Sequence, residues 1–450
     1  MDKMQEVKDY IKHEIKQGSI KKGQRLPSCR EIAKLLSVNK ITVNKAYKSL
    51  ENDHLLYSIP RGGYYCIGND DNAIIPNKFF DFSTVKPDPS LLPYLAFTHA
   101  MNHAIEEHKH TLFDYESPMG FLPLRETLME KLTENGIYTS INQIMITNGA
   151  QEAIYLSLKT LFQNPSCGSL LVESPTYGLV HDIAKSLHIN CIGVTRDQTG
   201  INTKELEQIL KKEKIKAFYI IPRHHNPTGY SLSEKNKNSI VKLCSLYHVT
   251  IIEDDYLADL GIDKRNLPLH YYDTNQITLY IRSFSKTFMP GLRLGAVIMP
   301  DILISSMKSE KYLLGLNTSS LSQASLDFFI RSGMYDKHIK KVNTCYRKKL
   351  EKARQILSSI CLDEISYHVP NIGLFIWIML PESVSSQQII KKLAQKNILV
   401  SSPNQFYLNH QRKKSIRLCI SGIPISDLSS IKMIVDEIQY DLCQNSVPVK

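Results

Sequence analysis

The sequence predicts two folding units of different class: a small N-terminal unit that is mainly α with a β-hairpin, and a large α/β unit with a mostly parallel sheet. A chain of 450 residues is longer than one ordinary compact core. Residues 1–68 hold 13 Lys and Arg against 7 Asp and Glu, about half of the net charge of +11. Beyond residue 80, short β-rich segments alternate with longer helical segments, which is typical of an α/β unit.

The composition excludes several classes of protein. Hydrophobic residues make up 42% of the chain, with 20 Gly and 20 Pro, which is typical of a globular protein and not of a disordered or fibrous one. No apolar run reaches about 18 residues, and residues 1–22 hold no apolar signal core, so we expect a cytoplasmic protein that does not enter a membrane. The nine cysteines form no Cys/His cluster at zinc spacing, so no metal site is predicted.

Three short helices are predicted in the first 50 residues. The first ends near Gly18, and its apolar stripe consists of Met4, Val7, Ile11 and Ile15. Ser28 precedes Glu31 by three residues, which is a capping box that starts the second helix. After a short turn at residues 37–39, the buried face of the third helix consists of Val43, Ala46, Tyr47 and Leu50.

Two short strands follow, at residues 55–58 and 64–67, around the segment Pro60-Arg61-Gly62-Gly63. Helix, tight turn, helix and a hairpin with a cation at its tip form a winged helix-turn-helix, in which the third helix lies in the major groove of DNA. The basic charge of the unit favours a polyanionic partner. A solvated lysine surface or a mere packing module stays open as the alternative interpretation. The candidate DNA-binding residues are Ser28, Arg30, Lys40, Thr42, Asn44, Arg61 and Gly62.

Over about residues 5–67 the sequence resembles the GntR family of bacterial winged-helix repressors. The resemblance rests on residues 26–33 (LPSCREIA), residues 38–43 (VNKITV) with Ala46, Tyr47 and Leu50, and the glycines of the hairpin. It implies that this unit binds double-stranded DNA. Asn39-Lys40 stands where the family more often has Ser-Arg, so the cation is retained while the base preference is expected to differ.

A polar, breaker-rich stretch, residues 69–79, is predicted to be a linker. Beyond it, strands are predicted at residues 169–172, 217–221, 249–252 and 277–281. Ligands of open α/β sheets bind at the carboxyl ends of the strands, so chemistry is expected there. Polar motifs follow the predicted strands at residues 147–151 (TNGAQ), 173–177 (ESPTY), 226–229 (NPTG), 253–256 (EDDY) and 283–286 (SFSK), the last with Arg293 seven residues on.

These residue types together fit one chemistry. A desolvated lysine amine can lose its proton and form a Schiff base with an aldehyde. A strand-end carboxylate can pair with a protonated pyridine nitrogen, which makes the ring an electron sink. An arginine, two serines and a helix N-terminus can bind a phosphate. Pyridoxal 5′-phosphate (PLP) has an aldehyde, a pyridine and a phosphate, so it is the predicted cofactor.

The order and spacing of the motifs resemble fold-type I PLP-dependent aminotransferases over about residues 80–445. The resemblance implies that Lys286 is the Schiff-base lysine and that Asp254 pairs with the pyridine nitrogen. It also implies that Tyr177 stacks on the ring and that Asn226 and Tyr256 bond the ring hydroxyl. The implied phosphate site consists of Gly149, Ala150, Gln151, Ser283, Ser285 and Arg293.

Three further positions follow from the same resemblance. Tyr115 corresponds to the tyrosine that reaches the phosphate of a neighbouring subunit, and Arg417 corresponds to the arginine that binds a substrate carboxylate. The plain alternative for Arg417 is a cation at a strand edge. Val85 stands where related chains usually have glycine, so we expect a narrowed ligand pocket and an altered ligand.

A GntR-type winged helix fused to an aminotransferase-like domain is the architecture of the MocR regulators, which the chain resembles over nearly its whole length. The resemblance implies a DNA-binding domain in residues 1–68, a linker in residues 69–79 and a PLP-binding domain in residues 80–450. It also implies a homodimer in which PLP or an amino-compound effector alters DNA affinity. Two alternatives stay open: a catalytically active aminotransferase acting on an amino acid and a 2-oxo acid, and a sensor of free PLP.

Overall fold

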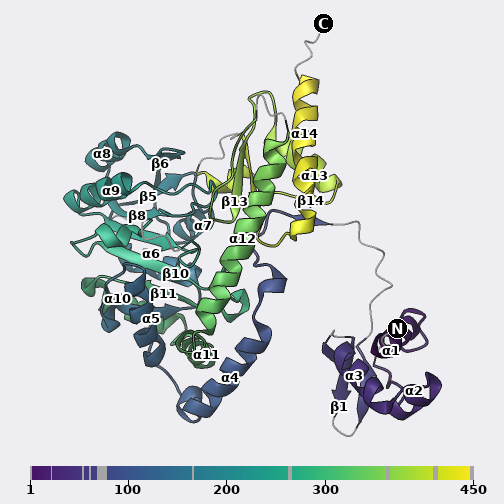
Figure 1. Ribbon diagram of the computed structural model, residues 1–450. Helices are drawn as coiled ribbons and strands as arrows, with labels where there is room; N and C mark the ends of the chain where they lie inside the picture. The colour runs from purple at the N-terminus through teal and green to yellow at the C-terminus, as the bar shows by residue number, and fades with distance from the viewer. Residues whose placement is uncertain are drawn as a thin grey trace. The chain divides into compact units, whose positions relative to one another are not determined.

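The computed structural model describes residues 3–21, 23–52, 55–59, 62–67, 79–164, 167–261, 266–360, 365–408 and 414–445. The contacts divide the chain into two compact units, Met1–Phe79 and Phe80–Lys450 (Figure 1). None of the helices in the described ranges is long and apolar enough to cross a membrane.

The small unit contains three helices and a hairpin, as predicted. The helices are α1 (Lys3–Lys16), α2 (Cys29–Leu35) and α3 (Lys40–Asn52), and the hairpin pairs β1 (Leu56–Ile59) with β2 (Gly63–Cys66). The Ser28 hydroxyl accepts the Glu31 N–H, and the Glu31 carboxylate accepts the Ser28 N–H at 2.6 Å. The predicted capping box is therefore confirmed, and it fixes where α2 begins.

The core of the small unit contains the apolar residues that the periodicity selected. Its members include Val7, Ile11, Ile15, Val43, Ala46, Tyr47 and Leu50, while Met4 is only half-buried. Compared with the predicted ranges, β1 is shifted by one residue toward the C-terminus and β2 by one residue toward the N-terminus. Since α3 buries one face against α1 and α2, its opposite face is left to solvent.

The large unit is built on an eight-stranded, mostly parallel sheet, as predicted. Its strand order is β4-β11-β10-β9-β8-β5-β6-β7, and only the pairs made by β11 and β7 are antiparallel. The strands are β4 (Ile144–Thr147), β5 (Ser169–Ser174), β6 (Cys191–Asp197), β7 (Gly200–Ile201), β8 (Ile215–Ile220), β9 (Thr250–Asp255), β10 (Thr278–Ser283) and β11 (Gly295–Ile298). Several polar motifs expected in loops occupy the last residues of these strands.

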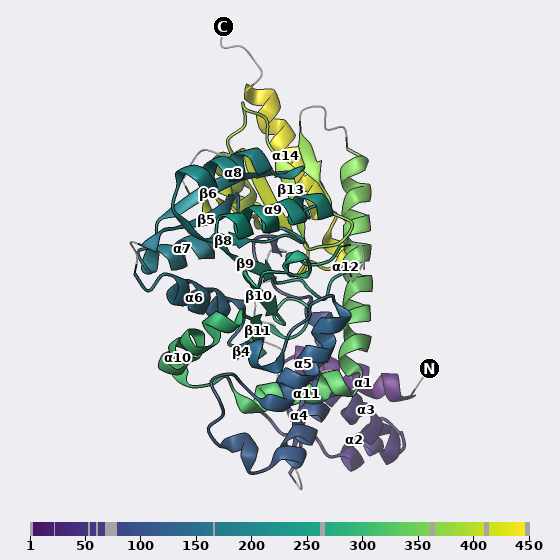
Figure 2. The same cartoon turned by 90° about the vertical axis from the view of Figure 1, so that its left-hand side faces the viewer.

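Helices cover both faces of this sheet. Alternate strand residues enter two different cores: Leu171, Phe218 and Ile251 pack in one cluster, whereas Val172, Tyr219 and Ile252 pack in another. The first cluster is closed by α8 (Thr203–Lys212) and α9 (Glu234–Leu246), which lie on the near side of the strands in Figure 2. The second is closed by α6 (Ala150–Leu161), α7 (Leu179–Ser186) and α10 (Ile304–Gly315).

Other segments complete the large unit. Two small sheets are formed by β12 (Ser366–His368), β13 (Phe375–Met379) and β15 (Ser415–Cys419), and by β3 (Phe80–Asp81) with β14 (Ile398–Leu399). The remaining helices are α4 (Tyr94–His108), α5 (Leu122–Glu134), α11 (Ser320–Arg331), α12 (Met334–Ser358), α13 (Ser386–Gln395) and α14 (Ser430–Asn445). The strand β15 brings Arg417 to the carboxyl-end side of the large sheet, where it reaches Asn226.

Candidate cofactor cavity and DNA-binding surface

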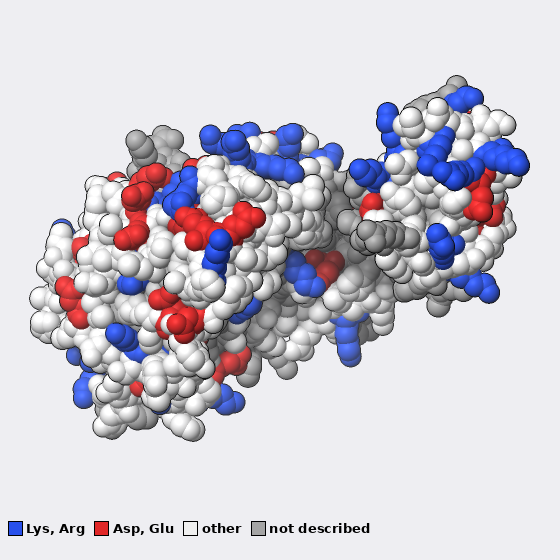
Figure 3. All heavy atoms as spheres, turned by 90° about the horizontal axis from the view of Figure 1, so that it is seen from below, with Lys and Arg blue, Asp and Glu red and all other residues white. Residues whose placement is uncertain are grey.

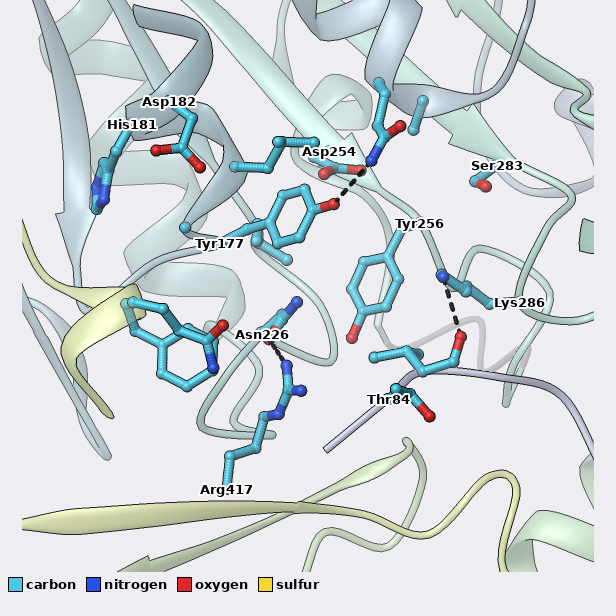
Figure 4. A pocket seen from close by; sticks show the side chains of 18 of the residues that line it. Thr84, Tyr177, His181, Asp182, Asn226, Asp254, Tyr256, Ser283, Lys286 and Arg417 are labelled. Atoms are coloured by element: carbon cyan, nitrogen blue, oxygen red, sulfur yellow. Dashed lines mark hydrogen bonds between the residues drawn. The ribbon is translucent and has the colours of Figure 1, made fainter. Parts of the chain in front are cut away.

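A cavity of about 840 Å³ lies at the carboxyl ends of β9 and β10 (Figure 4). Most of the predicted cofactor and substrate residues line it: Ala150, Gln151, Tyr177, Asn226, Asp254, Tyr256, Ser283, Ser285, Lys286, Arg293 and Arg417. These residues come from positions as far apart as 150 and 417, and the parallel strands bring them to one edge of the sheet.

Three consecutive acidic residues end β9, and they have different partners. Glu253 accepts two backbone N–H groups, and Asp255 pairs with Arg223. Asp254 Oδ2 accepts the Tyr219 hydroxyl at 2.6 Å, and its buried Oδ1 has no hydrogen-bond partner among the described residues. Burial raises the pKa of Asp254 to about 7, although the hydrogen bond from Tyr219 opposes this shift. Of the three, Asp254 is the carboxylate that lines the cavity.

Lys286 lies three residues beyond the end of β10 and faces Asp254 across the cavity (Figure 4). Its Nζ donates a hydrogen bond to the Val85 carbonyl oxygen at 3.1 Å. Burial lowers the pKa of the Lys286 amine, and the positive charges of Arg293 and Arg417 lower it further. A larger fraction of this amine is therefore neutral near pH 7 than for an exposed lysine, which suits attack on an aldehyde.

One end of the cavity combines a helix N-terminus with a cation and two hydroxyls. Gly149 caps α6 with φ 82°, and a Cβ there would lie 3.4 Å from the Arg293 guanidinium. Arg293 adopts a left-handed φ of 53° and donates to the carbonyl oxygen of residue 148 and to Gln151 Oε1, both at 3.3 Å. Ser283 and Ser285 are buried beside it. Free N–H groups, a guanidinium and hydroxyls are suitable ligands for a phosphate.

The aromatic residues of the cavity hold positions that suit a flat ring. The Tyr177 hydroxyl accepts a long hydrogen bond from Gln151 Nε2 at 3.4 Å, and its ring faces the cavity (Figure 4). The buried Tyr256 hydroxyl donates to the His224 carbonyl oxygen at 2.7 Å. Asn226 Oδ1 accepts from Arg417. The side chains expected to meet the ring hydroxyl are thus already held by other groups of this chain.

Arg417 is buried at the opposite end of the cavity. Its Nη1 donates to Asn226 Oδ1 at 2.9 Å, and its Nη2 donates to the Ser83 carbonyl oxygen at 2.6 Å and to Ser401 Oγ at 2.7 Å. The guanidinium also lies over the ring of Phe375, 4.6 Å from its centroid. A guanidinium has five N–H donors, and Arg417 Nε has no hydrogen-bond partner among the described residues. A buried cation with spare donors is suited to bind a carboxylate.

Two predicted residues do not line this cavity. Gly149 caps α6 next to the Arg293 guanidinium, and Tyr115 is 85% exposed. The sequence reasoning also missed several lining residues, because they come from segments without recognisable motifs. These are Thr84, Gly178, Leu179, His181, Asp182, Lys185, Ile221 and residues 404–408. Val85, which was expected to lie close to the ligand, also lines the cavity. His181 and Asp182 lie on α7, which begins two residues after Tyr177, so the helix that follows the motif at residues 173–177 was the signal that could have found them.

The predicted DNA-binding residues lie on the surface of the small unit. Ser28, Arg30, Lys40 and Asn44 are exposed, while Thr42 and Gly62 are half-buried. Arg61 lies outside the described residues. The Ser28 side chain is engaged in its capping box. Lys48 was not predicted, yet it is exposed on α3 at a four-residue step from Asn44, so Lys40, Asn44 and Lys48 share one helix face.

Comparisons with known proteins agree with this division. Residues 90–431 match the family "Aminotransferase class I and II", and residues 3–66 match "Bacterial regulatory proteins, gntR family". The HTH-type transcriptional regulator YcxD of Bacillus subtilis is 32% identical over 447 residues, which cover 97% of this chain and 100% of YcxD. The chain belongs to this family of regulators, in which a GntR winged helix is fused to an aminotransferase class I and II domain.

A further regulator and two aminotransferase structures are also similar to this chain. The HTH-type transcriptional regulator NorG of Staphylococcus aureus is 26% identical over 426 residues, which cover 88% of this chain and 94% of NorG. A crystal structure of the Pyrococcus horikoshii kynurenine aminotransferase, in complex with PMP, has a TM-score of 0.76 at 25% identity, over 81% of this chain and 91% of that enzyme. A multiple substrate aminotransferase of Thermococcus profundus has a TM-score of 0.77 at 23% identity, over 82% and 94%, which shows the shared fold.

The predicted fold class is therefore confirmed, and so is the resemblance to the MocR regulators. The chain is a transcription regulator with a GntR-type DNA-binding domain and a domain of a PLP-dependent family.

Proposed function

We propose that the large unit binds PLP and an amino compound, and that this binding changes the affinity of the small unit for duplex DNA. The observation that carries the proposal is the single cavity that brings together Lys286, Asp254 and Arg417. A regulator without a ligand of this chemistry has no need of a desolvated amine and two buried charged groups in one cavity, since burying each of them is costly.

The residues of the cavity fit the cofactor. Asp254 offers a buried oxygen that has no hydrogen-bond partner among the described residues, which suits a protonated pyridine nitrogen. The N-terminus of α6, Arg293 and the two serines suit a phosphate, and Tyr177 presents a flat surface to a ring. Lys286 would hold the aldehyde carbon covalently. When bound, the cofactor supplies an electron-accepting ring to an attached amine.

Arg417 supports an amino acid or a related carboxylate as the effector. Its spare donors would bind the carboxylate, and Asn226, which is fixed by Arg417, would keep that ligand beside the cofactor. A ligand shifts DNA binding only if it has different affinities for the two conformations of the protein. We therefore infer that the bonds from Arg417 to Ser83 and Ser401 differ between these conformations, because they join distant segments of the chain.

DNA binding is assigned to the exposed side of the small unit, with Arg30 and Lys40 at phosphates or base edges. Arg61 is retained in this assignment from its sequence position.

The boundaries that we propose for the DNA-binding domain, the linker and the PLP-binding domain are residues 1–68, 69–79 and 80–450. We also propose a homodimer, in which the exposed Tyr115 reaches the phosphate in the cavity of the partner.

Covalent trapping tests the cofactor assignment. The full-length protein incubated with PLP and reduced with borohydride is expected to carry the added mass on the peptide that contains Lys286. Lys286→Ala should lose this label completely. Lys185→Ala is the matched control, since Lys185 lines the same cavity and should not change the labelling. An unchanged label in Lys286→Ala would reject the assignment.

A second measurement tests the effector. Arg417→Lys retains a positive charge but cannot make the same set of hydrogen bonds. In titrations followed by cofactor absorbance, it should bind PLP like the parent and respond about tenfold more weakly to amino acids. If DNA binding of both proteins responds to PLP and to no amino acid, the signal is free PLP and the amino-acid form of the proposal is wrong.

A catalytically active aminotransferase is the second candidate, because Lys286, Asp254 and Arg417 are all present in the cavity. A mixture of an amino acid and a 2-oxo acid should then exchange the amino group repeatedly with catalytic amounts of protein. Conversion limited to less than one equivalent per chain would favour the sensor.

A further inference from the structure

The helix α12 concentrates the positive charge of the large unit. It contains eight Lys and Arg against two acidic residues, an excess of +6. Residues 69–450 as a whole hold 42 Lys and Arg against 37 Asp and Glu, an excess of +5. Apart from α12, this part of the chain is therefore close to neutral. A charge excess confined to one helix is not explained by the general solubility of the unit.

Most of these cations face solvent. There are two exceptions: Lys349 is buried against Asp88 at 2.8 Å, and Arg354 is half-buried against backbone carbonyl oxygens. The acidic residues of the helix are already engaged: Asp336 pairs with a lysine of α5 at 2.7 Å, and Glu351 lies 3.8 Å from an arginine one turn away. They leave the exposed lysines of α12 without compensation.

Four of these lysines form one line. Lys337, Lys341, Lys348 and Lys352 fall within about 60° of one another around the helix axis and extend over about 22 Å. All four are exposed, and none of them makes an ion pair with another described residue. In Figure 3, Lys and Arg atoms gather along the upper edge of the large unit, the side on which α12 lies. We call these four residues the lysine line.

We propose that the lysine line binds the phosphate backbone of duplex DNA, as a second contact besides the winged helix. The inference rests on the proposed DNA binding of the small unit. Duplex DNA carries one negative charge per about 1.7 Å of its axis when both strands are counted, so a duplex length of about 22 Å carries about 13 phosphates, roughly half of them on each strand. None of the large hydrophobic side chains exposed in the described residues belongs to α12, which argues against a membrane surface as the partner.

The connection between the two units favours the same partner. A fully extended segment as long as residues 68–78 spans at most about 40 Å. DNA that is held by the small unit therefore lies within a short tether of the large unit, and its local concentration there is high. Weak phosphate contacts of α12 would add to the affinity under these conditions, although they would be negligible for free DNA fragments.

The test compares three variants of the full-length protein. In the first, the lysine line is neutralised by Lys337→Gln, Lys341→Gln, Lys348→Gln and Lys352→Gln. The matched control removes four exposed lysines from α8 and α9 of the same unit, at positions 204, 212, 235 and 242. The third variant, Arg30→Ala with Lys40→Ala, reports on the winged helix. Since all of these side chains are exposed, thermal unfolding should be unchanged, and this is checked first.

Binding to a fluorescein-labelled duplex of about 60 base pairs, roughly six helical turns, is measured by anisotropy at several salt concentrations. Loss of the lysine line should weaken binding about tenfold or more near 0.1 M salt. It should also flatten the slope of log K against log salt by about two to four units. The control on α8 and α9 should change the slope by less than one unit.

The outcomes separate this inference from the proposed function. If the Arg30 and Lys40 variant loses affinity while the lysine-line variant matches the control on α8 and α9, the lysine line is not a DNA contact and the winged-helix assignment stands. An equal loss in the lysine-line variant and the control would likewise overturn the inference, since it would report net charge only. If the parent does not bind duplex DNA even at low salt, both proposals are wrong.

Discussion

The exposed face of α3 and the cavity around Lys286 place charged groups in opposite environments. On α3, Lys40 and Lys48 are exposed to solvent, where they can attract any polyanion that approaches. In the cavity, Asp254 is buried, and its pKa is raised to about 7. Exposure leaves the lysines of α3 accessible to a polyanion, whereas burial disfavours the ionised form of Asp254 until a ligand brings a positive charge to it.

The largest expected effect that separates the two regions concerns Asp254. Asp254→Asn keeps the size of the side chain and can still accept the Tyr219 hydroxyl, but it cannot pair as a charge with a protonated ring nitrogen. We expect PLP affinity to fall about a hundredfold, which corresponds to the loss of one charged hydrogen bond. DNA affinity without cofactor should stay within twofold of the parent, roughly the error of such titrations. Absorbance titration with PLP measures the first value, and a loss of DNA binding without cofactor would contradict the separation.

The second effect is the pH dependence of stability in the cofactor-free protein. The pKa of Asp254 is raised above its ordinary value, so the folded state binds more protons than the unfolded state between about pH 4 and pH 7, and stability falls as the pH rises through this range. Asp254→Asn lacks this contribution, so it should gain about 2 kcal/mol relative to the parent between pH 5 and pH 8. Burial also raises the pKa of Glu253 to about 7. Because Glu253 is present in both proteins, its contribution cancels in the difference between their stabilities.

Urea unfolding of both proteins at pH 5 and pH 8 measures this difference. A constant difference at the two pH values would mean that Asp254 is ionised at both, and would contradict the burial argument. Lys40→Ala in the small unit is the control. It should change the free energy of unfolding by less than about 0.5 kcal/mol at either pH, since Lys40 is exposed.

The third effect belongs to the small unit. Arg30→Ala with Lys40→Ala should weaken DNA binding about tenfold and flatten the salt dependence by about two units, because two phosphate contacts are lost. PLP affinity should be unchanged, since neither residue belongs to the unit that contains the cavity. Gel-shift titrations at several salt concentrations measure the slope. If the variant loses PLP binding instead, the two regions are not independent.

The smallest effect concerns Tyr219, which positions Asp254 from the neighbouring strand β8. Tyr219→Phe removes the hydrogen bond to Asp254 Oδ2, so the pKa of Asp254 should rise further. PLP affinity should fall about fivefold at pH 7, and the loss should shrink at pH 9, where Asp254 is ionised in both proteins. A loss that is equal at both pH values would assign Tyr219 a purely structural part.

Local sequence was sufficient for elements whose cause lies within a few residues. The capping box of Ser28 and Glu31 and the buried stripe of α3 depend on spacing alone, and both were predicted correctly. Four strands of the large sheet, β5, β8, β9 and β10, were predicted to within a few residues for the same reason. Lys286 was assigned from the resemblance of the combined motifs to the aminotransferases, and the structure places it in the lining of the cavity.

The sequence alone determined the two classes of unit, the order of the motifs and the chemistry of the cofactor that they fit. The tertiary structure decided what each side chain contacts. It distinguished Asp254 from its acidic neighbours, because Asp254 accepts a hydrogen bond from Tyr219 whereas Asp255 pairs with Arg223. Both partners come from another part of the chain. It also joined Arg417 to Ser83, which is 334 residues away in the sequence. Such contacts depend on the register of strands and on burial, and neither is encoded in a local spacing.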